Sequence, residues 1–423
     1  MRRINRMKEI TILFACSFII MGLMGCRSNV RTQTGDDLKN TEIQEEPLKI
    51  IAHYESTSMR KAMKELVEDY EQMNNGKSVE LEFIPLDQYR RELSVRMENG
   101  ELGDIIICEN SVMPTLINMG ILCDISEDVD NANLLGNYNI NLWSNTRSNG
   151  KIYGIPLLSD PYVMYYNKDI FAYRELTLPE TWEEFAVTAQ NVNMKNVGTY
   201  ALGFGVRQSE EMANIYLQLL YSMGGNLRAV NDENGMKVFE LLERFRDDEL
   251  ISPDCINWNE IDACEMFGKR EVAIMFNKLS AYTQLMEKKL DFEVGLAAMP
   301  YEKKETDLFF GDNAGITVDA DYGGALDFIE YLSSKEAVRK LSDLTNTIPV
   351  RLDVGYENEN PFLQDYAKRQ REAGIAKGSY NRWFNISDTI AKGVFDILTQ
   401  ESLDIQVIAD EVQDKVRISI IEN

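Results

Sequence analysis

The segment from Gly150 to Phe171 constrains the fold more than any other part of the sequence, because most of it must be extended. Pro156 and Pro161 break any helix, and the β-branched and aromatic run from Tyr162 to Tyr166 favours a strand. An extended segment of this kind can bridge two lobes. The length of 423 residues agrees, because it suits two domains of about 150 to 200 residues each.

The first part of the chain alternates short apolar runs with amphipathic segments. The runs predict buried strands, and the 3.6-residue periodicity predicts helices between them. A β-α-β-α-β order requires a parallel sheet with right-handed crossovers, so the loops after the strands collect at its carboxyl edge, where open α/β sheets bind ligands. The strands are predicted at residues 48–52, 79–84 and 104–108, and the helices at residues 59–70 and 89–98.

A second set of elements follows the extended segment. Thr181 is placed to cap a helix, and Glu184 completes a capping box. Further strands are predicted at residues 200–206, 271–276 and 292–299, and helices at residues 212–223 and 235–246. The segment 306–318 crosses back, and the segment 335–344 returns to the first part of the fold. The remaining helices are predicted at residues 324–332, 361–372, 388–398 and 405–420.

Residues 1–26 have the features of a signal peptide. Basic residues precede an apolar stretch, Ile10 to Met24, that is shorter than the roughly 20 residues of a membrane span. The stretch ends in Leu-Met-Gly-Cys, which resembles the lipobox of bacterial lipoproteins and implies lipidation of Cys26 and an anchor on the outer face of the cell membrane. The alternative is an ordinary signal peptide cleaved near Gly25. Residues 27–47 are polar and predict a flexible tether.

The formal net charge of −25 limits the possible partners. Loss of residues 1–25 would make the charge more negative, because they carry four basic side chains and one acidic side chain. So acidic a surface repels phosphate backbones. Nucleic acid is therefore a poor partner, and a polyanionic ligand is disfavoured.

The cysteines that follow Cys26 do not have the spacing of a zinc site, since no CxxC occurs. They are Cys108, Cys123, Cys255 and Cys264. An exported protein permits disulfides, whereas the apolar run around Cys108 is typical of a buried free thiol. Both redox states stay open at this point.

Residues 319–330 partly match a calcium-binding loop. They place oxygen ligands at positions 1, 3, 9 and 12 and a glycine at position 6. Position 5 is Gly323, which supplies no side-chain ligand, and a helix capped by Asp321 is the more natural interpretation. We therefore predict no metal site.

The sequence offers little for catalysis. His53 is the only histidine, so any Ser-His-Asp triad would have to use it, and no G-x-S-x-G elbow, H-E-x-x-H helix or P-loop occurs. Gly203-Phe204-Gly205 lacks the third glycine of a dinucleotide fingerprint. With 69 acidic residues, no particular carboxylate pair indicates a glycosidase. We therefore expect no enzyme.

Several short sequence motifs of this chain occur together in one protein family. They are Lys151-Ile-Tyr-Gly-Ile-Pro156 followed by Tyr166-Asn-Lys-Asp169, Pro179-Glu-Thr-Trp-Glu-Glu-Phe185, Gly311-Asp-Asn-Ala-Gly315 and Ile348-Pro-Val-Arg351. In content and order the chain from about residue 48 to 420 resembles family 1 of the extracellular solute-binding proteins of ABC importers, which includes maltose-binding proteins.

This resemblance implies an α/β fold of the periplasmic-binding-protein type II, with two discontinuous lobes joined by hinge crossovers. Lobe 1 would comprise residues 48–157 and 309–355, and lobe 2 residues 158–308 and 356–423. The implied function is capture of a carbohydrate, such as an oligosaccharide, in the cleft between the lobes and its delivery to permease subunits. The implied protein is a monomeric lipoprotein without a cofactor.

Sugar recognition needs an aromatic platform for the apolar sugar face and polar groups for the hydroxyl rim. Trp383 lies where the family commonly places a stacking tryptophan, although a core tryptophan fits the same pattern. Asp160 lies where maltose-binding relatives use a hinge carboxylate, the alternative being an exposed acid. The resemblance and the strand-end positions add Tyr54, Glu55, Asn110, Tyr162, Tyr282, Asp312, Asn313 and Arg382. Cys108-Glu109 stands where a maltose-type protein has an aromatic residue, which argues against maltose itself.

Other functions remain open. A glycan-binding adhesin or sensor would bind sugar without a permease, and a glycan hydrolase would turn it over. A binding protein of the same fold could also take a polyamine or a peptide, which the acidic charge permits.

Overall fold

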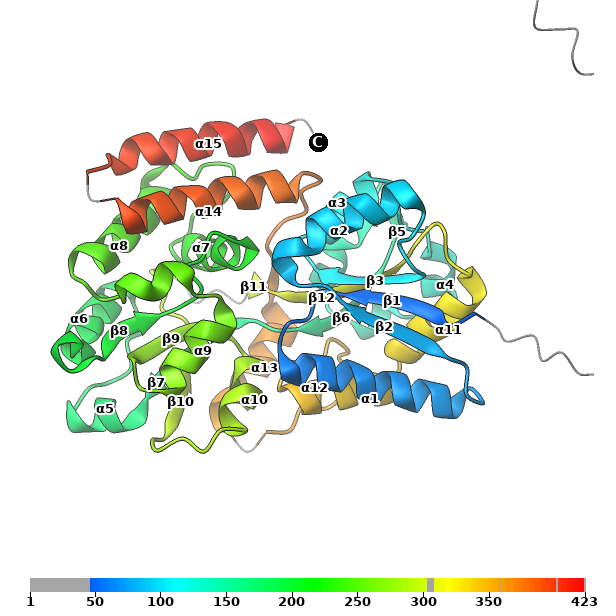
Figure 1. Cartoon of the computed structure of the whole chain (residues 1–423), viewed down its shortest axis with the longest axis horizontal. Coiled ribbons are helices and arrows are strands. Elements are labelled where there is room, and N and C mark those ends of the chain that lie inside the picture. Colours follow the sequence, from blue (N-terminus) through cyan, green and yellow to red (C-terminus); the bar gives the residue numbers. More distant parts are fainter. Residues whose placement is uncertain (1–45, 303–307, 359, 401, 422–423) are drawn as a thin grey trace, which may run out of the picture. The chain divides into compact units, whose positions relative to one another are not determined.

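The computed structural model describes residues 46–302, 308–358, 360–400 and 402–421, which form two sheets covered by helices (Figure 1). The predicted signal peptide with Cys26 and nearly all of the tether lie outside the described residues. Among the helices that are described, none has the length and apolar character needed to cross a membrane.

The first sheet contains the strands predicted at the start of the chain. Its members are β1 (Leu48–Ala52), β2 (Val79–Phe83), β3 (Ile105–Glu109), β6 (Ile155–Ser159) and β12 (Gly311–Ile316), in the order β2-β1-β3-β12-β6. β1 pairs in parallel with β2 and β3, through the connecting helices α1 (Thr57–Met73) and α2 (Leu86–Asn99), which confirms the predicted β-α-β-α-β order. β12 is antiparallel to both β3 and β6.

The second sheet contains β7 (Tyr162–Asn167), β8 (Tyr200–Gly203), β9 (Val272–Lys278) and β10 (Val294–Ala297), in the order β10-β7-β9-β8. β7 is antiparallel to β9 and β10, whereas β8 and β9 are parallel. The helices of this part are α5 (Lys168–Tyr173), α6 (Trp182–Val192), α7 (Glu210–Ser222), α8 (Glu233–Asp247), α9 (Glu260–Gly268) and α10 (Ala281–Met286).

The remaining elements complete both halves. The helices are α3 (Met113–Asn118), α4 (Ser126–Asn131), α11 (Tyr322–Leu332), α12 (Lys335–Thr345), α13 (Pro361–Ala373), α14 (Trp383–Thr399) and α15 (Ile405–Ile421). The short strands are β4 (Arg147–Ser148), β5 (Lys151–Ile152), β11 (Leu308–Phe309) and β13 (Ile375–Ala376). In Figure 1, α1, α2, α3, α11 and α12 surround the first sheet, and α5 to α9 with α14 and α15 lie on the side of the second sheet.

The chain passes between the sheets where the sequence predicts a crossing. β6 ends at Ser159 in the first sheet, and β7 begins at Tyr162 in the second, so Asp160 and Pro161 form the connection. The return path enters β12 at Gly311, whose φ is 142°. A side chain there would place its Cβ 2.1 Å from the carbonyl oxygen of Leu158. This close approach explains why the motif begins with glycine.

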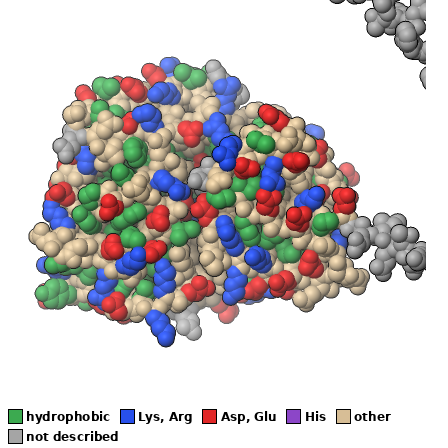
Figure 2. Space-filling view, in the orientation of Figure 1, with side chains coloured by type: hydrophobic (Ala, Val, Ile, Leu, Met, Phe, Trp, Pro, Cys, Tyr) green, Lys and Arg blue, Asp and Glu red, His purple; other side chains and the backbone are tan. Residues whose placement is uncertain are grey.

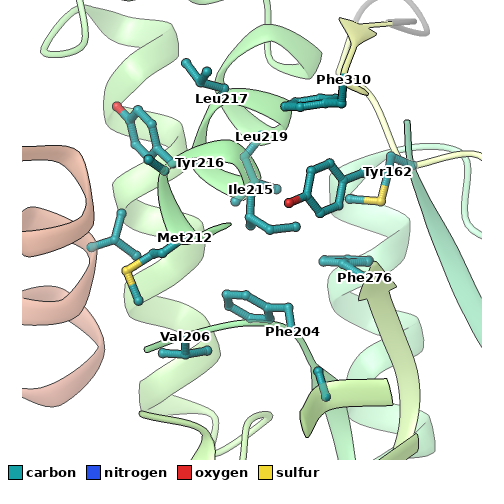
Figure 3. Packing of buried hydrophobic residues seen from close by; sticks show 14 of the residues in the cluster. Tyr162, Phe204, Val206, Met212, Ile215, Tyr216, Leu217, Leu219, Phe276 and Phe310 are labelled. Atoms are coloured by element: carbon teal, nitrogen blue, oxygen red, sulfur yellow. The ribbon is translucent and has the colours of Figure 1, made fainter. Parts of the chain in front are cut away.

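The second sheet is built around an aromatic core (Figure 3). The Tyr162 and Phe310 rings are edge to face with centroids 4.9 Å apart, and Phe276 packs against Phe204. Ile215 of α7 belongs to the same buried cluster. Residues from both crossings are therefore anchored in the core of the second half.

Some local predictions need correction. The strand predicted at 200–206 ends at Gly203, because the amides of Val206 and Arg207 donate to the Trp258 carbonyl at 3.0 and 2.9 Å instead of joining a ladder. Asp321 precedes α11 as predicted, but its side chain makes no capping hydrogen bond. The helix predicted at 388–398 begins earlier, at Trp383. The capping box of Thr181 and Glu184 is confirmed.

Charged side chains of both signs cover the surface. On the face shown in Figure 2, Lys and Arg are interspersed with Asp and Glu. The net negative charge is therefore not gathered into a single acidic patch on this face.

Candidate ligand-binding cleft

A small cavity of about 90 Å³ lies where the two sheets meet. Its first-sheet wall includes residues that follow β1 or end β3, together with the start of β12, and its second-sheet wall includes the end of β9 and the N-terminal turns of α7 and α9. The polar residues that line it are His53, Tyr54, Glu55, Ser56, Glu109, Asp160, Glu211, Glu260, Lys278, Ser280 and Asp312. The cavity lies at the carboxyl ends of β1, β3 and β9, as expected of a ligand site in an α/β protein.

Lys278 joins the two sheets at the centre of this site. Its ammonium lies 2.7 Å from Glu109, the last residue of β3, and 3.3 Å from Glu260 at the start of α9. Burial opposes the charge of Glu109, but the charges of Lys278 and Lys377 outweigh burial and lower the pKa of Glu109 to about 2. Burial likewise opposes the charge of Lys278, yet Glu109 and Glu260 raise its pKa well above the ordinary value. The pair is therefore ionised at neutral pH.

Asp160 at the crossing is held by neutral donors. Its carboxyl accepts hydrogen bonds from the Ser280 amide at 2.8 Å and the Ser280 hydroxyl at 2.6 Å. Burial raises the pKa of Asp160 to about 7, in spite of the opposing influence of Lys278 and these bonds. Asp160 therefore changes its charge close to neutral pH.

The first-sheet wall holds a second ionisable pair. His53 Nε2 lies 2.8 Å from Asp312 Oδ1. Burial lowers the pKa of His53, but the Asp312 carboxylate outweighs burial and leaves the pKa raised. The neighbouring Tyr54 is buried, and its hydroxyl has no hydrogen-bond partner of ordinary geometry among the described residues.

A buried ammonium lies deeper between the sheets. Lys377 Nζ donates to Asn214 Oδ1 at 3.0 Å, and Asn214 Nδ2 donates to Glu109 Oε2 at 2.8 Å. The same ammonium lies 4.5 Å from the centroid of the Phe310 ring and 5.9 Å from that of Trp383. This arrangement combines hydrogen bonding with cation–π contact.

Trp383 packs inside the protein. It is 1% exposed, its indole nitrogen donates to Glu210, and Tyr380 stacks on it with ring centroids 6.4 Å apart. It does not line the cavity described above. In this geometry Trp383 serves as the packed start of α14, which is the alternative that the sequence left open.

The structure brings together four of the predicted site residues. Tyr54, Glu55, Asp160 and Asp312 line the cavity. The other six do not, which are Asn110, Tyr162, Tyr282, Asn313, Arg382 and Trp383. Among them, Asn110 donates to the Phe309 carbonyl at 3.0 Å, the Tyr162 hydroxyl donates to Glu260, and Arg382 lines a different cavity of about 250 Å³ beside α2 and α3.

Sequence reasoning missed several cavity residues. His53 directly precedes Tyr54, and Glu109 directly follows the predicted third strand, so both had a strand-end signal. Lys278 and Ser280 lie in the loop after a predicted strand. Glu211 and Glu260 lie in the first turns of α7 and α9, where acids are common in any helix, so no sequence signal marks them.

Among the described residues, no group of three His, Cys, Asp or Glu side chains is placed to hold a metal. The partial calcium loop is divided by the start of α11 at Tyr322. The four described cysteines are free, and Cys108 is buried in β3 as the apolar run predicted.

A larger open groove of about 910 Å³ lies on the first sheet's other edge. It is lined by residues such as Leu48, Gly103 and Asp104, which begin or precede strands. Open α/β sheets bind ligands at the opposite, carboxyl edge. We therefore assign the candidate site to the cavity between the sheets.

Comparisons with known proteins identify the family of the chain. The profile of the bacterial extracellular solute-binding proteins matches residues 56–339. A binding protein of Brucella abortus is 24% identical over 247 residues, which are 56% of this chain and 59% of that protein, so the match spans less than two thirds of this relative. The multiple sugar-binding protein of Streptococcus mutans is 24% identical over 370 residues, covering 82% of this chain and 86% of the relative.

Solved structures share the fold. A solute-binding protein of Thermotoga lettingae, bound with α-D-tagatose, has a TM-score of 0.80 at 20% identity and covers 89% of this chain and 100% of its own. The maltose-bound MalE3 of T. maritima has a TM-score of 0.77 at 18% identity and covers 88% of this chain and 99% of its own. The predicted two-part α/β architecture is confirmed.

Proposed function

Because the chain belongs to the bacterial extracellular solute-binding protein family, we propose that it captures a carbohydrate between its lobes and delivers it to the permease of an ABC importer. The observation that carries the proposal is the polar cavity at the carboxyl ends of β1, β3 and β9, between two sheets linked by crossing segments. The name of the Streptococcus relative and the sugars in the two solved structures support a carbohydrate as the ligand class.

The proposal treats residues 48–157 with 309–355 and residues 158–308 with 356–423 as two lobes that close on the ligand. Contacts between them support such a closed arrangement. Glu109 meets Lys278, and Asn346 Nδ2 donates to Thr283 Oγ1 at 2.8 Å. A ligand that touches both lobes only in the closed state shifts the equilibrium toward closure by its difference in affinity for the two states.

Entry of a sugar requires the lobes to separate. The cavity of about 90 Å³ is well below the ~300 Å³ at which small-molecule pockets begin. The contact between Glu109 and Lys278, which joins the two lobes, must therefore part during binding.

The proposed role is binding without chemical change of the ligand. His53 is hydrogen-bonded to Asp312, and no serine or cysteine among the described residues bonds its ring. Turnover of a bound glycan by the purified protein would contradict this part of the proposal.

We place the protein on the outer face of the cell membrane, as a monomer held by a lipid on Cys26. The support is the lipobox-like Leu-Met-Gly-Cys sequence. A Cys26→Ala variant should leave the membrane fraction and appear in the medium, and a variant that stays with the membrane would contradict the anchor.

The capture of a carbohydrate is tested by thermal unfolding with a panel of neutral and amine-bearing mono- and oligosaccharides. A sugar present at 100 times its Kd should stabilise the protein by about 2.7 kcal/mol. Stabilisation by a peptide or a polyamine, with none by any carbohydrate, would overturn the proposal.

A further inference from the structure

The cavity between the lobes carries an excess of acidic groups. Six carboxyl side chains line it, against one lysine and one histidine. The carboxyls are those of Glu55, Glu109, Asp160, Glu211, Glu260 and Asp312. Even with His53 protonated, the basic groups cannot balance six ionised carboxylates.

The basic groups are already engaged. Lys278 is shared by Glu109 and Glu260, and His53 pairs with Asp312. These contacts leave three of the six carboxyls, and two of these three are buried and have no basic partner within 4 Å among the described residues.

Asp160 and Glu211 are those two carboxyls, and both are more than nine-tenths buried, with exposures of 4% and 8%. Asp160 is bonded by Ser280, and among the described residues Glu211 accepts only the backbone amide of Glu260, at 3.1 Å. Burial and then the charge of Glu260 raise the pKa of Glu211 well above its ordinary value. An isolated buried carboxylate is costly, so each group must be either protonated or matched by a cation.

A second polar residue of the cavity is Tyr54. It is 4% exposed, and its buried hydroxyl lies beside the Asp312 carboxyl but forms no hydrogen bond of ordinary geometry among the described residues. Burial and then the charge of Asp312 raise its pKa well above the ordinary value, so the hydroxyl stays protonated. Because its contact with Asp312 lacks ordinary hydrogen-bond geometry, this hydroxyl can turn to a ligand hydroxyl.

The protein's own side chains illustrate how this region accommodates ammonium groups. Lys278 lies between two carboxylates, and Lys377 combines an amide oxygen with the faces of Phe310 and Trp383. Both ammonium groups are held between the sheets by groups that a ligand amine would also use.

We infer that the solute of this cleft is a cationic carbohydrate, with at least one protonated amine that is matched by Asp160 and Glu211 and with hydroxyls that reach Tyr54. This inference rests on the proposed carbohydrate capture and narrows its ligand class. A polyamine shares the ammonium chemistry but lacks the hydroxyls.

The inference predicts a defined pH dependence. The groups that face Asp160 are Lys278, Glu260, Tyr54 and Tyr165, together with the Ser280 donors. An ammonium needs the ionised carboxyl, so affinity should rise as pH increases through about 7, the pKa of Asp160. A neutral sugar would not need that ionisation.

The test is calorimetric titration with three matched disaccharides and spermidine. The disaccharides are the β-1,4-linked dimers of glucosamine, of N-acetylglucosamine and of glucose, which differ only in the C2 substituent of each ring. We expect the glucosamine dimer to bind at least 100-fold more tightly than the other two at pH 7.5, and its affinity to fall at least tenfold at pH 5.5.

Charge-removing variants of the same shape provide the matched test. Asp160→Asn and Glu211→Gln should each reduce the preference for the amine at least tenfold, whereas Glu183→Gln on the exposed face of α6 should leave it unchanged. If either variant fails to fold, the pH dependence of the unaltered protein decides the question.

The outcomes separate this inference from the function on which it rests. Equal or tighter binding of the neutral dimers would overturn the cationic ligand and leave carbohydrate capture standing. Binding of spermidine alone would retain the ammonium chemistry but overturn the carbohydrate, and with it the inference. Binding of neither a carbohydrate nor spermidine would overturn both.

Discussion

The ammonium of Lys278 carries the main electrostatic contact between the sheets. Its side chain is 15% exposed and that of Glu109 is 4% exposed, so the pair gains from the low dielectric of the interior but has lost most of its hydration. Removing one partner leaves a buried charge, whereas removing both leaves none. The two residues should therefore be strongly coupled.

A double-mutant cycle measures this coupling. We expect Lys278→Met and Glu109→Gln to lower the free energy of unfolding by amounts that differ from their joint effect by about 1 to 3 kcal/mol. Urea unfolding of the two single variants and the double variant at pH 7 gives the value. Effects that add within about 0.5 kcal/mol would show that the pair does not hold the sheets together.

Substitution of Trp383 tests whether this residue packs in the core or stacks on a ligand. Because it is buried against Tyr380 and hydrogen-bonds Glu210, Trp383→Ala should cost about 3 to 5 kcal/mol of stability. Trp383→Phe keeps a ring and should retain ligand affinity within a few fold. Loss of affinity in Trp383→Phe with unchanged urea unfolding would support the stacking role predicted from the sequence.

The titration of buried groups predicts how stability changes with pH. The pKa of Asp160 and that of Glu210 are both raised to about 7, chiefly by burial, so the folded state binds more protons than the unfolded chain between about pH 4 and 7. The raised pKa of His53 acts in the same direction. The free energy of unfolding should therefore fall as pH rises from 5 to 8.

Chemical unfolding at several pH values checks this expectation. Asp160→Asn removes one of the titrating groups and should make the decrease shallower. An increase in stability from pH 5 to pH 8 in the unaltered protein would contradict the assignment of these carboxyls.

At the scale of elements, the sequence correctly predicted the features that depend on neighbouring residues. The Thr181 capping box and the alternation of strands and helices before Cys108 depend on contacts within a few residues, and both are as predicted. The end of β8 depends on Trp258, about fifty residues away, which the sequence does not reveal. For the same reason Glu211 and Glu260 could not be predicted, because the fold brings α7 and α9 to the cavity.

The capping box gives a prediction for a single helix. The Thr181 side chain accepts from the Glu184 amide, and the Glu184 carboxylate accepts from the Thr181 amide. Thr181→Ala should therefore lower the free energy of unfolding by about 1 kcal/mol. Thr57→Ala, at an exposed position of α1 without a capping bond, is the control and should change stability by less than about 0.5 kcal/mol. Equal effects of the two substitutions would contradict the role of the box.

At the scale of the whole molecule, the order of the chain explains why both lobes contribute to one cleft. The crossings at Asp160 and at Gly311 bring the end of β6 and the start of β12 to the same edge, beside the end of β9. The sequence predicted these crossings, because prolines and glycine mark them. It could not predict the size of the cavity, which depends on how the two sheets and their helices pack against each other.

Closure can be tested by linking the lobes directly. Asn346 and Thr283 hydrogen-bond at 2.8 Å from opposite lobes, so a short thiol crosslinker should join cysteines at these positions only in the closed arrangement. The linked Asn346→Cys, Thr283→Cys protein should take up ligand at least tenfold more slowly than the unlinked protein, because entry requires separation. The control links Asp69→Cys to Lys340→Cys, whose native side chains pair at 2.7 Å within lobe 1, and this link should leave the rate unchanged. Stopped-flow measurement of binding distinguishes the two, and equal rates for both linked proteins would mean that ligand reaches the cavity without movement of the lobes.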